Sequence, residues 1–382
     1  MRFDVLIVGA SFAGLAAAKT AASRGLSVAV IDAKREAGAR VHTSGILVRE
    51  AMEEIDIPHR LTRRVPGVRL YSPNLKSIDL FSPGYAFFTT ETADLLRWMA
   101  AEAREAGAHI LYATRFEGAT RDGDLIRLKG PDLSARYLIG ADGARSRVAE
   151  AFGLSLNRTF LTGVEVELEP DDSLDPRFLH CFADSAMAPG YIAWAAPGPS
   201  VLQVGLAVRD RAKPDLAGFM ARTERVFPWS RMKVVGRRSG LIPNGGPLAR
   251  TAAPGVLLVG DAAGWVSPMT GGGIRLAFRY GRRAASLIAD RLLNGGALPE
   301  TALAREIPRF RLKWGLRQVL DLAPPNALID LALATAPMRR VAERLYFHRR
   351  NDAGIDREAY LRWIEEQRET THAVMLAKAG IQ

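Results

Sequence analysis

The sequence predicts an α/β protein with a Rossmann-like domain, an inserted antiparallel β-sheet domain and a C-terminal helical segment. Three observations predict this fold class. Apolar runs lead into glycine-rich segments at residues 3–14, 137–146 and 256–274. Residues 159–240 alternate apolar and polar side chains between Gly and Pro turns, which is typical of antiparallel strands. Residues 298–378 have a helical pattern.

The N-terminal segment has the pattern of a strand–turn–helix unit that binds a nucleotide. The apolar run 3–8 predicts a buried parallel strand, Gly9 ends it in a tight turn, and residues 13–22, from Ala13 on, predict a helix of small residues. Gly14 allows that helix to pack closely on the strand. The free N–H groups at the helix N-terminus suit a pyrophosphate. Ser11 stands where the fingerprint has its second glycine.

An acid follows the second predicted strand at the position that ribose recognition requires. Residues 27–31 predict this strand, and Asp32 ends it about 20 residues after the glycine turn. A carboxylate there would bind the ribose hydroxyls and would disfavour a ribose 2′-phosphate. Ala33, Lys34 and Arg40 continue this segment and are included in the predicted cofactor site. The alternative is a strand–helix unit with an ordinary glycine turn.

Two further glycine-rich segments each carry an aspartate. Asp142 and Gly143 follow a short apolar strand, and so do Gly260 and Asp261. Each aspartate taken alone could simply serve a turn or cap a helix, since Asp-Gly and Gly-Asp are common turn pairs. The later segment goes on to the remaining candidate cofactor ligands, which are Pro268, Gly271, Gly272, Gly273 and Ile274. Together with the N-terminal unit, these segments predict one bound FAD that the chain touches three times.

The chain of 382 residues is long enough for two domains and an appendage. We predict a discontinuous FAD-binding domain, an inserted substrate-binding sheet domain and a helical tail. The FAD-binding domain comprises 1–60, 86–158 and 245–295, the sheet domain comprises 61–85 and 159–244, and the tail comprises 296–382. Within the first domain, a helix is expected from about Thr92 to Ala106.

The order of these segments resembles the flavoprotein superfamily that includes aromatic hydroxylases and geranylgeranyl reductases. Residues 190–198 further resemble the Tyr-x-Trp-x-Phe-Pro signature of the geranylgeranyl reductase family: Tyr191, Trp194 and Pro197 occur in that order, and Ala196 replaces the phenylalanine. In that family this strand lines the cavity for a long polyprenyl chain. The smaller Ala196 would widen such a cavity. Alternatively, Trp194 simply fills the core of the sheet.

The resemblance implies roles for the cofactor residues. Asp142 would lie near the pyrophosphate and the flavin edge, and Asp261 would bind the ribityl or pyrophosphate region. Residues 271–274 would face the isoalloxazine with their N–H groups, and the helix that they open would favour the negative charge of reduced flavin. Strand alternation predicts two sets of side chains that share a face: Tyr191, Ala193 and Ala195, and on the opposite face Ile192, Trp194 and Ala196.

Two positions depart from the family's pattern. Many relatives carry a cysteine after the second strand, where this chain has residues 40–47 without one. His42 or Thr43 could supply a polar group there, although a lone histidine is more often structural. Thr92 aligns with an arginine that relatives carry at the start of a helix, which removes one expected FAD contact. The candidate catalytic residues are therefore Tyr191, Trp194 and His42.

The activity implied by the resemblance is hydride transfer from reduced, non-covalently bound FAD to a carbon–carbon double bond of an isoprenoid or other apolar substrate. No second Gly-x-Gly-x-x-Gly unit offers a separate nicotinamide-binding domain, so the reductant would be NAD(P)H that binds transiently or a ferredoxin-type donor. A monooxygenase that hydroxylates an aromatic or peptide substrate is the main alternative. A flavin-binding maturation or interaction protein is a further alternative, and a flavin-dependent halogenase is disfavoured.

The net charge of +11 comes largely from the C-terminal region. Its basic residues are Arg305, Arg309, Arg311, Lys313, Arg317, Arg339, Arg340, Arg344, Arg349 and Arg350, and apolar residues lie between them. Such helices can lie on an anionic membrane surface, or they can be solvated faces. Nucleic acid is disfavoured because no recognition module accompanies the charge.

Other features restrict the class of protein. No apolar stretch reaches ~18 residues, so no membrane-spanning helix is expected. No signal peptide is evident, and the single Cys181 excludes an internal disulfide framework and a cysteine-based metal cage. We therefore expect no metal and a cytoplasmic protein, with contact to a membrane surface as an open alternative.

Overall fold

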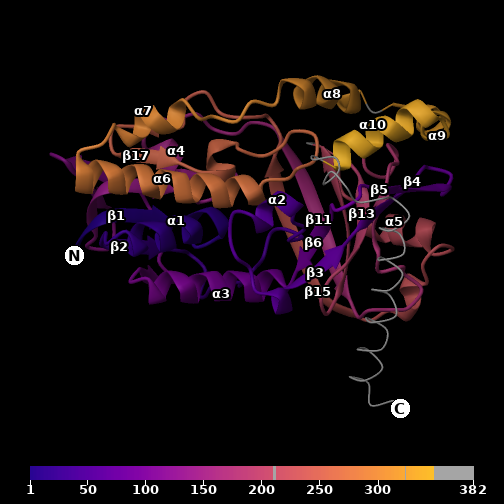
Figure 1. Ribbon diagram of the computed structural model, residues 1–382, viewed down its shortest axis with the longest axis horizontal. Helices are drawn as coiled ribbons and strands as arrows, with labels where there is room; N and C mark the ends of the chain where they lie inside the picture. Colours follow the sequence, from indigo (N-terminus) through magenta and orange to yellow (C-terminus); the bar gives the residue numbers. More distant parts are fainter. Residues whose placement is uncertain (210–211, 323, 348–382) are drawn as a thin grey trace, which may run out of the picture.

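The structure, a computed structural model, describes residues 1–209, 212–322 and 324–347. Two large sheets lie side by side, and the C-terminal helices extend along one edge of the molecule (Figure 1). The α/β fold predicted from the sequence is confirmed. The boundaries of the three predicted parts stay predictions. The part of the predicted tail beyond residue 347 lies outside the described residues.

The first sheet contains the nucleotide-binding strands. Its main path is β16-β17-β10-β1-β2-β7; in addition, β9 pairs with β10 and β8 pairs with β9. Neighbouring strands from β17 to β7 are parallel, and β1 pairs with β10 on one side and with β2 on the other. Their bounds are β1 (Arg2–Val8), β2 (Val28–Ile31), β7 (His109–Leu111), β8 (Ala119–Asp122), β9 (Leu125–Leu128), β10 (Ser134–Gly140), β16 (Ala252–Ala253) and β17 (Val256–Leu258).

Helices α1 (Phe12–Ser23), α3 (Thr92–Glu105) and α6 (Ile274–Asn294) cover this sheet (Figure 1). Helix α1 is built almost wholly from small and buried residues, so α6 approaches it closely. A Cβ atom at Gly281 of α6 would lie only 2.3 Å from the Ala13 carbonyl oxygen. Shorter helices are α2 (Arg49–Met52), α4 (Arg147–Ala151) and α7 (Pro299–Ala304).

The second sheet has seven strands in the order β15-β11-β14-β13-β12-β4-β5 within the described residues. Their bounds are β4 (Gly67–Tyr71), β5 (Ser77–Phe81), β11 (Phe160–Leu168), β12 (Phe178–Phe182), β13 (Ala193–Pro197), β14 (Leu202–Arg209) and β15 (Val234–Pro243). The sheet is antiparallel except where β12 pairs with β4. Strands β3 (Thr62–Val65) and β6 (Phe87–Thr90) pair in a separate two-stranded sheet. Along the chain, β3 comes before β4 and β5 of the second sheet, and β6 comes after them.

The two faces of the seven-stranded sheet have different neighbours. We call one the inner face and define it by Glu165, Gly205, Trp194 and Cys181, which lie directly opposite one another on successive strands. The opposite face packs under α5 (Leu216–Thr223) in an apolar cluster that includes Phe219.

The C-terminal helices are α8 (Arg311–Asp321), α9 (Asn326–Leu333) and α10 (Ala336–Tyr346). Helix α10 covers part of the inner face, where Ala342 and Phe347 join a cluster with Leu70 and Cys181. In the described ranges, no helix is both long and apolar enough to cross a bilayer.

Candidate FAD site and active site

The N-terminal glycine turn has the geometry that close backbone packing requires. Gly9 has φ +108°, and a Cβ atom there would lie 2.3 Å from the Ala141 carbonyl oxygen. A Cβ atom at Gly14 would lie 1.8 Å from the Gly9 oxygen. Neither position can carry a side chain without movement of the backbone. These two glycines therefore let the ends of β1, α1 and β10 meet.

The carboxylate of Asp32 lies at this same meeting point. It accepts hydrogen bonds from the backbone N–H groups of Ala10 (2.7 Å) and Lys34 (2.7 Å). Ser11 is the N-cap residue of α1, and its side chain makes no capping hydrogen bond. Ala13, in the first turn of α1, is buried. The helix N-terminus and an adjacent acid are thus arranged as the nucleotide-binding prediction requires.

The other residues predicted after Asp32 are less enclosed. Ala33 and Arg40 are exposed, and Arg40 has a positive φ of 47°. Lys34 is half-buried, and this burial lowers the pKa of its ammonium group. No contact in the structure tests a role in FAD binding for these three residues, so that role stays a prediction.

Asp142 serves its own turn and the adjacent helix. Its carboxylate accepts hydrogen bonds from the Ser146 hydroxyl (2.6 Å) and from the N–H groups of Arg147 (2.7 Å) and Val148 (3.1 Å) at the start of α4. Burial raises the pKa of this carboxyl group. Gly143 has φ +85°, as a tight turn requires. Asp142 therefore stabilises its own turn and the start of α4, as the alternative interpretation of this aspartate predicts. Contact of Asp142 with FAD stays a prediction.

Asp261 differs from Asp142 because no described residue forms a hydrogen bond or an ion pair with its carboxylate. Asp261 lies in a 3-10 turn, Gly260–Ala263, that begins at Gly260 with φ +60°. A Cβ atom at Gly273 would lie 3.3 Å from Asp261 Oδ1, so the carboxylate is directed at the start of α6. Burial raises its pKa to about 6. A partly buried carboxylate without a partner among the described residues fits the hydroxyl groups of a bound cofactor.

A tight loop presents backbone donors beside Asp261. The N–H of Gly271 binds the Ser267 carbonyl (2.9 Å), and the N–H of Ser267 binds the Gly272 carbonyl (3.1 Å), with Pro268 buried between them. The N–H groups of Gly272 and Gly273 have no protein acceptor in the part of the chain that the structure describes. Ile274 then begins α6. These donors at a helix N-terminus fit the electronegative edge of a flavin.

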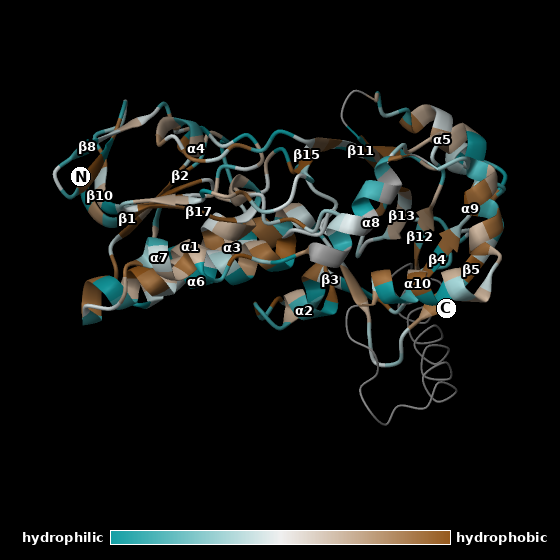
Figure 2. Cartoon of the chain, turned by 90° about the horizontal axis from the view of Figure 1, so that it is seen from above, coloured by the Kyte–Doolittle hydropathy of each residue, from teal (hydrophilic) through white to brown (hydrophobic). Residues whose placement is uncertain are grey.

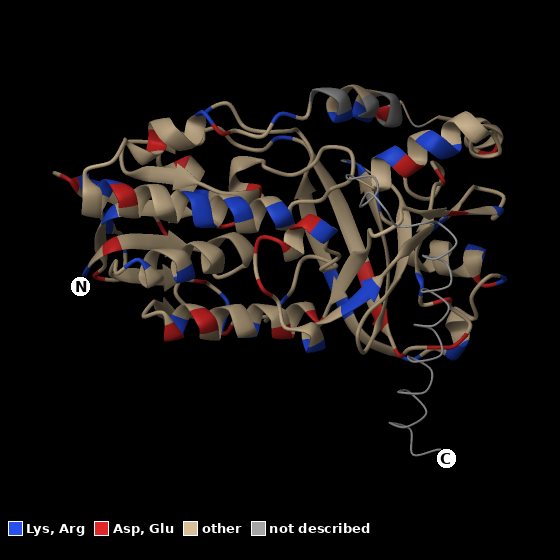
Figure 3. Ribbon diagram, in the orientation of Figure 1, with Lys and Arg blue, Asp and Glu red and all other residues tan. Residues whose placement is uncertain are grey.

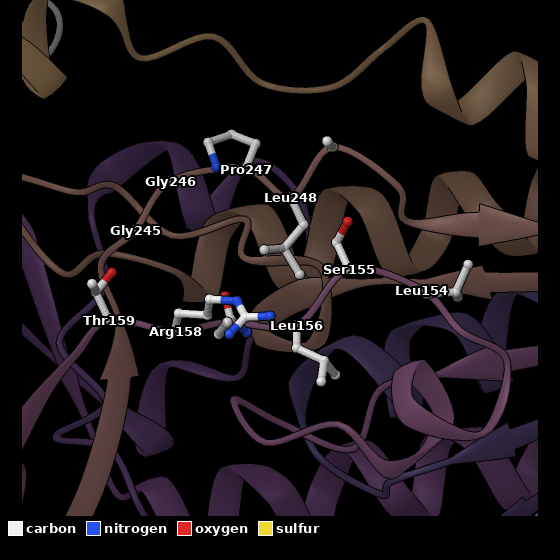
Figure 4. Close-up of a pocket in the computed structure, with 11 residues that line it drawn as sticks. Leu154, Ser155, Leu156, Arg158, Thr159, Gly245, Gly246, Pro247 and Leu248 are labelled. Atoms are coloured by element: carbon white, nitrogen blue, oxygen red, sulfur yellow. The ribbon is translucent and has the colours of Figure 1, made fainter.

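One residue that sequence reasoning missed holds two of these segments together. Asn157 Nδ2 donates to the carbonyl oxygens of Ala144 (3.0 Å) and Asp261 (2.8 Å). It lies in a pocket of about 440 Å³ lined by residues 154–159 and 245–249 (Figure 4). A single asparagine in a loop carries no sequence signal for such a role, because both of its partners are backbone atoms.

The two aromatic candidates lie in different surroundings. Trp194 belongs to β13 on the inner face, and its Nε1 donates to Glu165 Oε2 (3.0 Å). Its ring lies against Gly205, where a Cβ atom would be 2.7 Å from the ring. The Trp194 ring therefore packs on the sheet, and its indole N–H binds the buried carboxyl group of Glu165. The catalytic role predicted for it stays a prediction.

The expectation that Tyr191 shares a face with Ala193 and Ala195 is wrong. Tyr191 lies in the turn before β13, where strand alternation does not apply, and its hydroxyl donates to the Thr270 carbonyl. It is also three residues from Trp194, whereas the family signature spaces these aromatics by two and so falls on Ile192. Its contact with Thr270 nevertheless brings it to the glycine loop. Burial raises the pKa of the Tyr191 phenol well above its ordinary value.

The widening of the cavity that was expected at Ala196 stays a prediction. Ala196 is fully buried in the apolar cluster of the inner face. His42 is exposed, and its Nδ1 lies 2.9 Å from the Ser239 carbonyl oxygen. This contact ties the 40–45 loop to β15. The contact agrees with a structural role for His42, and the catalytic role predicted for this residue stays a prediction.

A buried polar cluster was not predicted. Arg238 of β15 forms an ion pair with Glu167 and reaches Glu165 Oε1 at 3.8 Å. Its guanidinium also donates to the Thr43 carbonyl (3.1 Å) and the Thr92 hydroxyl (3.4 Å). An arginine from the second sheet thus reaches the helix start where the sequence has Thr92. Burial raises the pKa of Glu165 to about 7, which allows this carboxyl to hold a proton near neutral pH.

Comparisons with known proteins agree with this geometry. A family model described as an FAD binding domain matches residues 2–303. The digeranylgeranylglycerophospholipid reductase of Methanothrix thermoacetophila is 32% identical, over 84% of this chain and 87% of that protein. The chain belongs to the geranylgeranyl reductase family. It is an FAD-dependent oxidoreductase.

Solved structures show how widely this fold is shared. A geranylgeranyl bacteriochlorophyll reductase-like protein from Thermoplasma acidophilum superposes with a TM-score of 0.78 at 23% identity, over 96% of each chain. A probable FAD-dependent monooxygenase from Pseudomonas aeruginosa superposes with a TM-score of 0.66 at 20% identity, over 86% of this chain and 99% of that one. The fold alone therefore does not separate reduction from oxygenation, and the family assignment rests on the sequence relatives of the geranylgeranyl reductase family.

Proposed function

We propose that this protein saturates carbon–carbon double bonds in the polyprenyl chains of a membrane lipid. The observation that supports this proposal most directly is the contact between Tyr191 and Thr270, which joins the turn before β13 of the second sheet to the glycine loop of the FAD site. An apolar chain on that face would lie beside the flavin edge. The named relative reduces a digeranylgeranylglycerophospholipid, which has such chains.

The protein itself would bind the substrate, orient it and the flavin, and donate a proton to the substrate. Bound, reduced FAD supplies the hydride, and saturation also requires a proton. We propose that Glu165 provides it, because its carboxyl is 5% exposed, lies on the inner face and is oriented by Trp194 and Arg238. Backbone donors at 271–274 would orient the flavin, and the apolar cluster would exclude water.

The test is single-turnover reduction of a digeranylgeranylglycerol phospholipid by the FAD-loaded protein, first reduced with dithionite under nitrogen. Product mass should rise by two hydrogens for each double bond. A gain of oxygen when air is admitted, without added hydrogen, would instead indicate the monooxygenase alternative. NAD(P)H and a reduced ferredoxin can then be compared as natural reductants, since the identity of the donor is part of the proposal.

The role of Glu165 is tested by its pH profile. The wild-type rate of flavin reoxidation by substrate should fall as pH rises through about 7, because the proton donor is lost. Glu165→Gln should be at least ~10²-fold slower with a flat profile. Glu169→Gln is the matched control, since Glu169 is exposed and paired with Lys233. A Glu165→Gln rate close to wild type would contradict the assignment.

A further inference from the structure

Apolar side chains are exposed together on the C-terminal helices. Helix α9 has no buried residue, although most of its residues are apolar. Leu328 and Leu331 are 56% and 67% exposed, at a helical spacing that places them on one side of α9. Figure 2 shows the apolar colour of this helix at the end of the molecule. The other exposed large apolar residues of this region are Trp314, Leu322, Met338 and Val341. Such a patch marks an interaction surface.

Basic side chains lie beside these apolar residues. On α10, Arg340 and Arg344 are exposed one turn apart, and Val341 beside them is also exposed. Figure 3 shows basic positions on α10 in blue. Among the described residues, neither of these two arginines forms an ion pair. The acids of this region are engaged elsewhere: Asp330 accepts from the Asn74 N–H, and Glu343 lies 3.8 Å from Arg339. Exposed leucines beside unpaired arginines fit an anionic lipid surface.

The other side of α10 faces the proposed substrate region. Ala342 is buried there, and Phe347 packs edge-on against Tyr85. Tyr346 lies beside Cys181, which is opposite Trp194 on the inner face. Helix α10 thus covers the apolar face with one side and presents Arg340, Val341 and Arg344 with the other.

We propose that α9 and α10 dock on an anionic lipid surface, so that a lipid-borne polyprenyl chain enters the inner face beneath α10 without crossing water. This proposal rests on the proposed function for the identity of the substrate, but the docking surface itself does not depend on the chemistry. The exposed leucines would insert among the acyl chains, and Arg340 and Arg344 would contact lipid phosphates.

Vesicle flotation of the full FAD-loaded protein tests the docking surface. The protein should float with phosphatidylcholine vesicles that contain 30 mol% phosphatidylglycerol and remain in solution with pure phosphatidylcholine. The double variants L328E/L331E and R340E/R344E should each reduce the bound fraction at least tenfold. The matched controls are V234E/V235E and R115E/K129E, which make the same changes in charge at exposed sites on other surfaces and should bind as wild type does.

The remaining outcomes separate docking from chemistry. L328E/L331E should keep wild-type turnover of a short prenyl substrate dissolved in detergent and lose turnover of the same double bonds presented in vesicles. Absence of binding by wild type to anionic vesicles, or equal binding by the helix variants, would overturn the docking proposal. So would a wild-type dimer that the helix variants dissociate, because a second copy would then cover the patch. Binding without any reductase activity would leave the surface in place and reject the proposed substrate.

Discussion

Asp142 and Asp261 both follow a parallel strand beside a glycine, yet their carboxylates have different partners. Asp142 accepts three hydrogen bonds at the start of α4, two from backbone N–H groups and one from the Ser146 hydroxyl, whereas the carboxylate of Asp261 has no partner in the described residues. Both segments have an aspartate beside a glycine, so the difference between the partners of the two carboxylates depends on the residues that follow each pair. Ser146 and a short helix occupy the first carboxylate, and the glycine loop before α6 leaves the second one open.

Substitution of each aspartate should therefore have a different effect. Asp261→Ala should weaken FAD binding by about 10- to 100-fold, the value of a charge-assisted hydrogen bond. Asp142→Ala should chiefly destabilise the protein by ~1 kcal/mol through loss of a helix cap. Fluorescence titration of apoprotein with FAD and urea unfolding measure the two effects. Equal loss of FAD affinity in both variants would contradict the assignment.

Glu165 should make stability depend on pH in a specific window. Its pKa is raised from 4.5 to about 7, so the folded state binds more protons than the unfolded state between these values. Stability then falls as pH rises from about 4.5 to 7. Relative to wild type, Glu165→Gln should gain stability over this window, by on the order of 3 kcal/mol at most. Urea unfolding of both apoproteins at pH 5 and pH 8 measures the difference, and parallel behaviour would contradict it.

At the scale of elements, the periodic segments could be predicted and the contacts between them could not. A helix expected over 92–106 is found as Thr92–Glu105, and the strand expected over 27–31 is found as Val28–Ile31. The cluster of Glu165, Trp194 and Arg238 depends on the register of four strands, which no local pattern specifies. Tyr191 was misplaced for a related reason, because the strand begins two residues after it.

The contact between α1 and α6 gives a prediction at this scale. Gly281→Leu should force the two helices apart, because even a Cβ atom would lie 2.3 Å from the Ala13 carbonyl oxygen. Overpacking of this kind costs ~1–3 kcal/mol, and the displaced start of α1 should also weaken FAD binding. Arg279→Leu is the control, since Arg279 is exposed on the same helix. Thermal unfolding with and without FAD measures both effects, and a Gly281→Leu protein as stable as the control would contradict the close packing.

At the scale of the whole molecule, the single cysteine reports whether α10 leaves the inner face. Cys181 is buried, and burial raises the pKa of its thiol to about 11, so very little reactive thiolate is present at pH 8. DTNB should therefore label native protein slowly and denatured protein at once. Phe347→Ala, which loosens α10, should accelerate labelling at least tenfold.

Phe227→Ala is the control for this experiment, because Phe227 is buried on the opposite face of the same sheet. Its labelling rate should change only as far as its global stability changes. Fast labelling of the native wild-type protein would show that α10 does not cover Cys181.

The bridge made by Asn157 has a consequence for how the empty protein takes up its cofactor. One amide nitrogen donates to the carbonyl oxygens of both Ala144 and Asp261, so these two loops are braced before FAD arrives. Association then needs little ordering of the receptor. Reconstitution is accordingly expected to proceed as a single bimolecular phase, and an Asn157→Ala receptor would first have to rearrange.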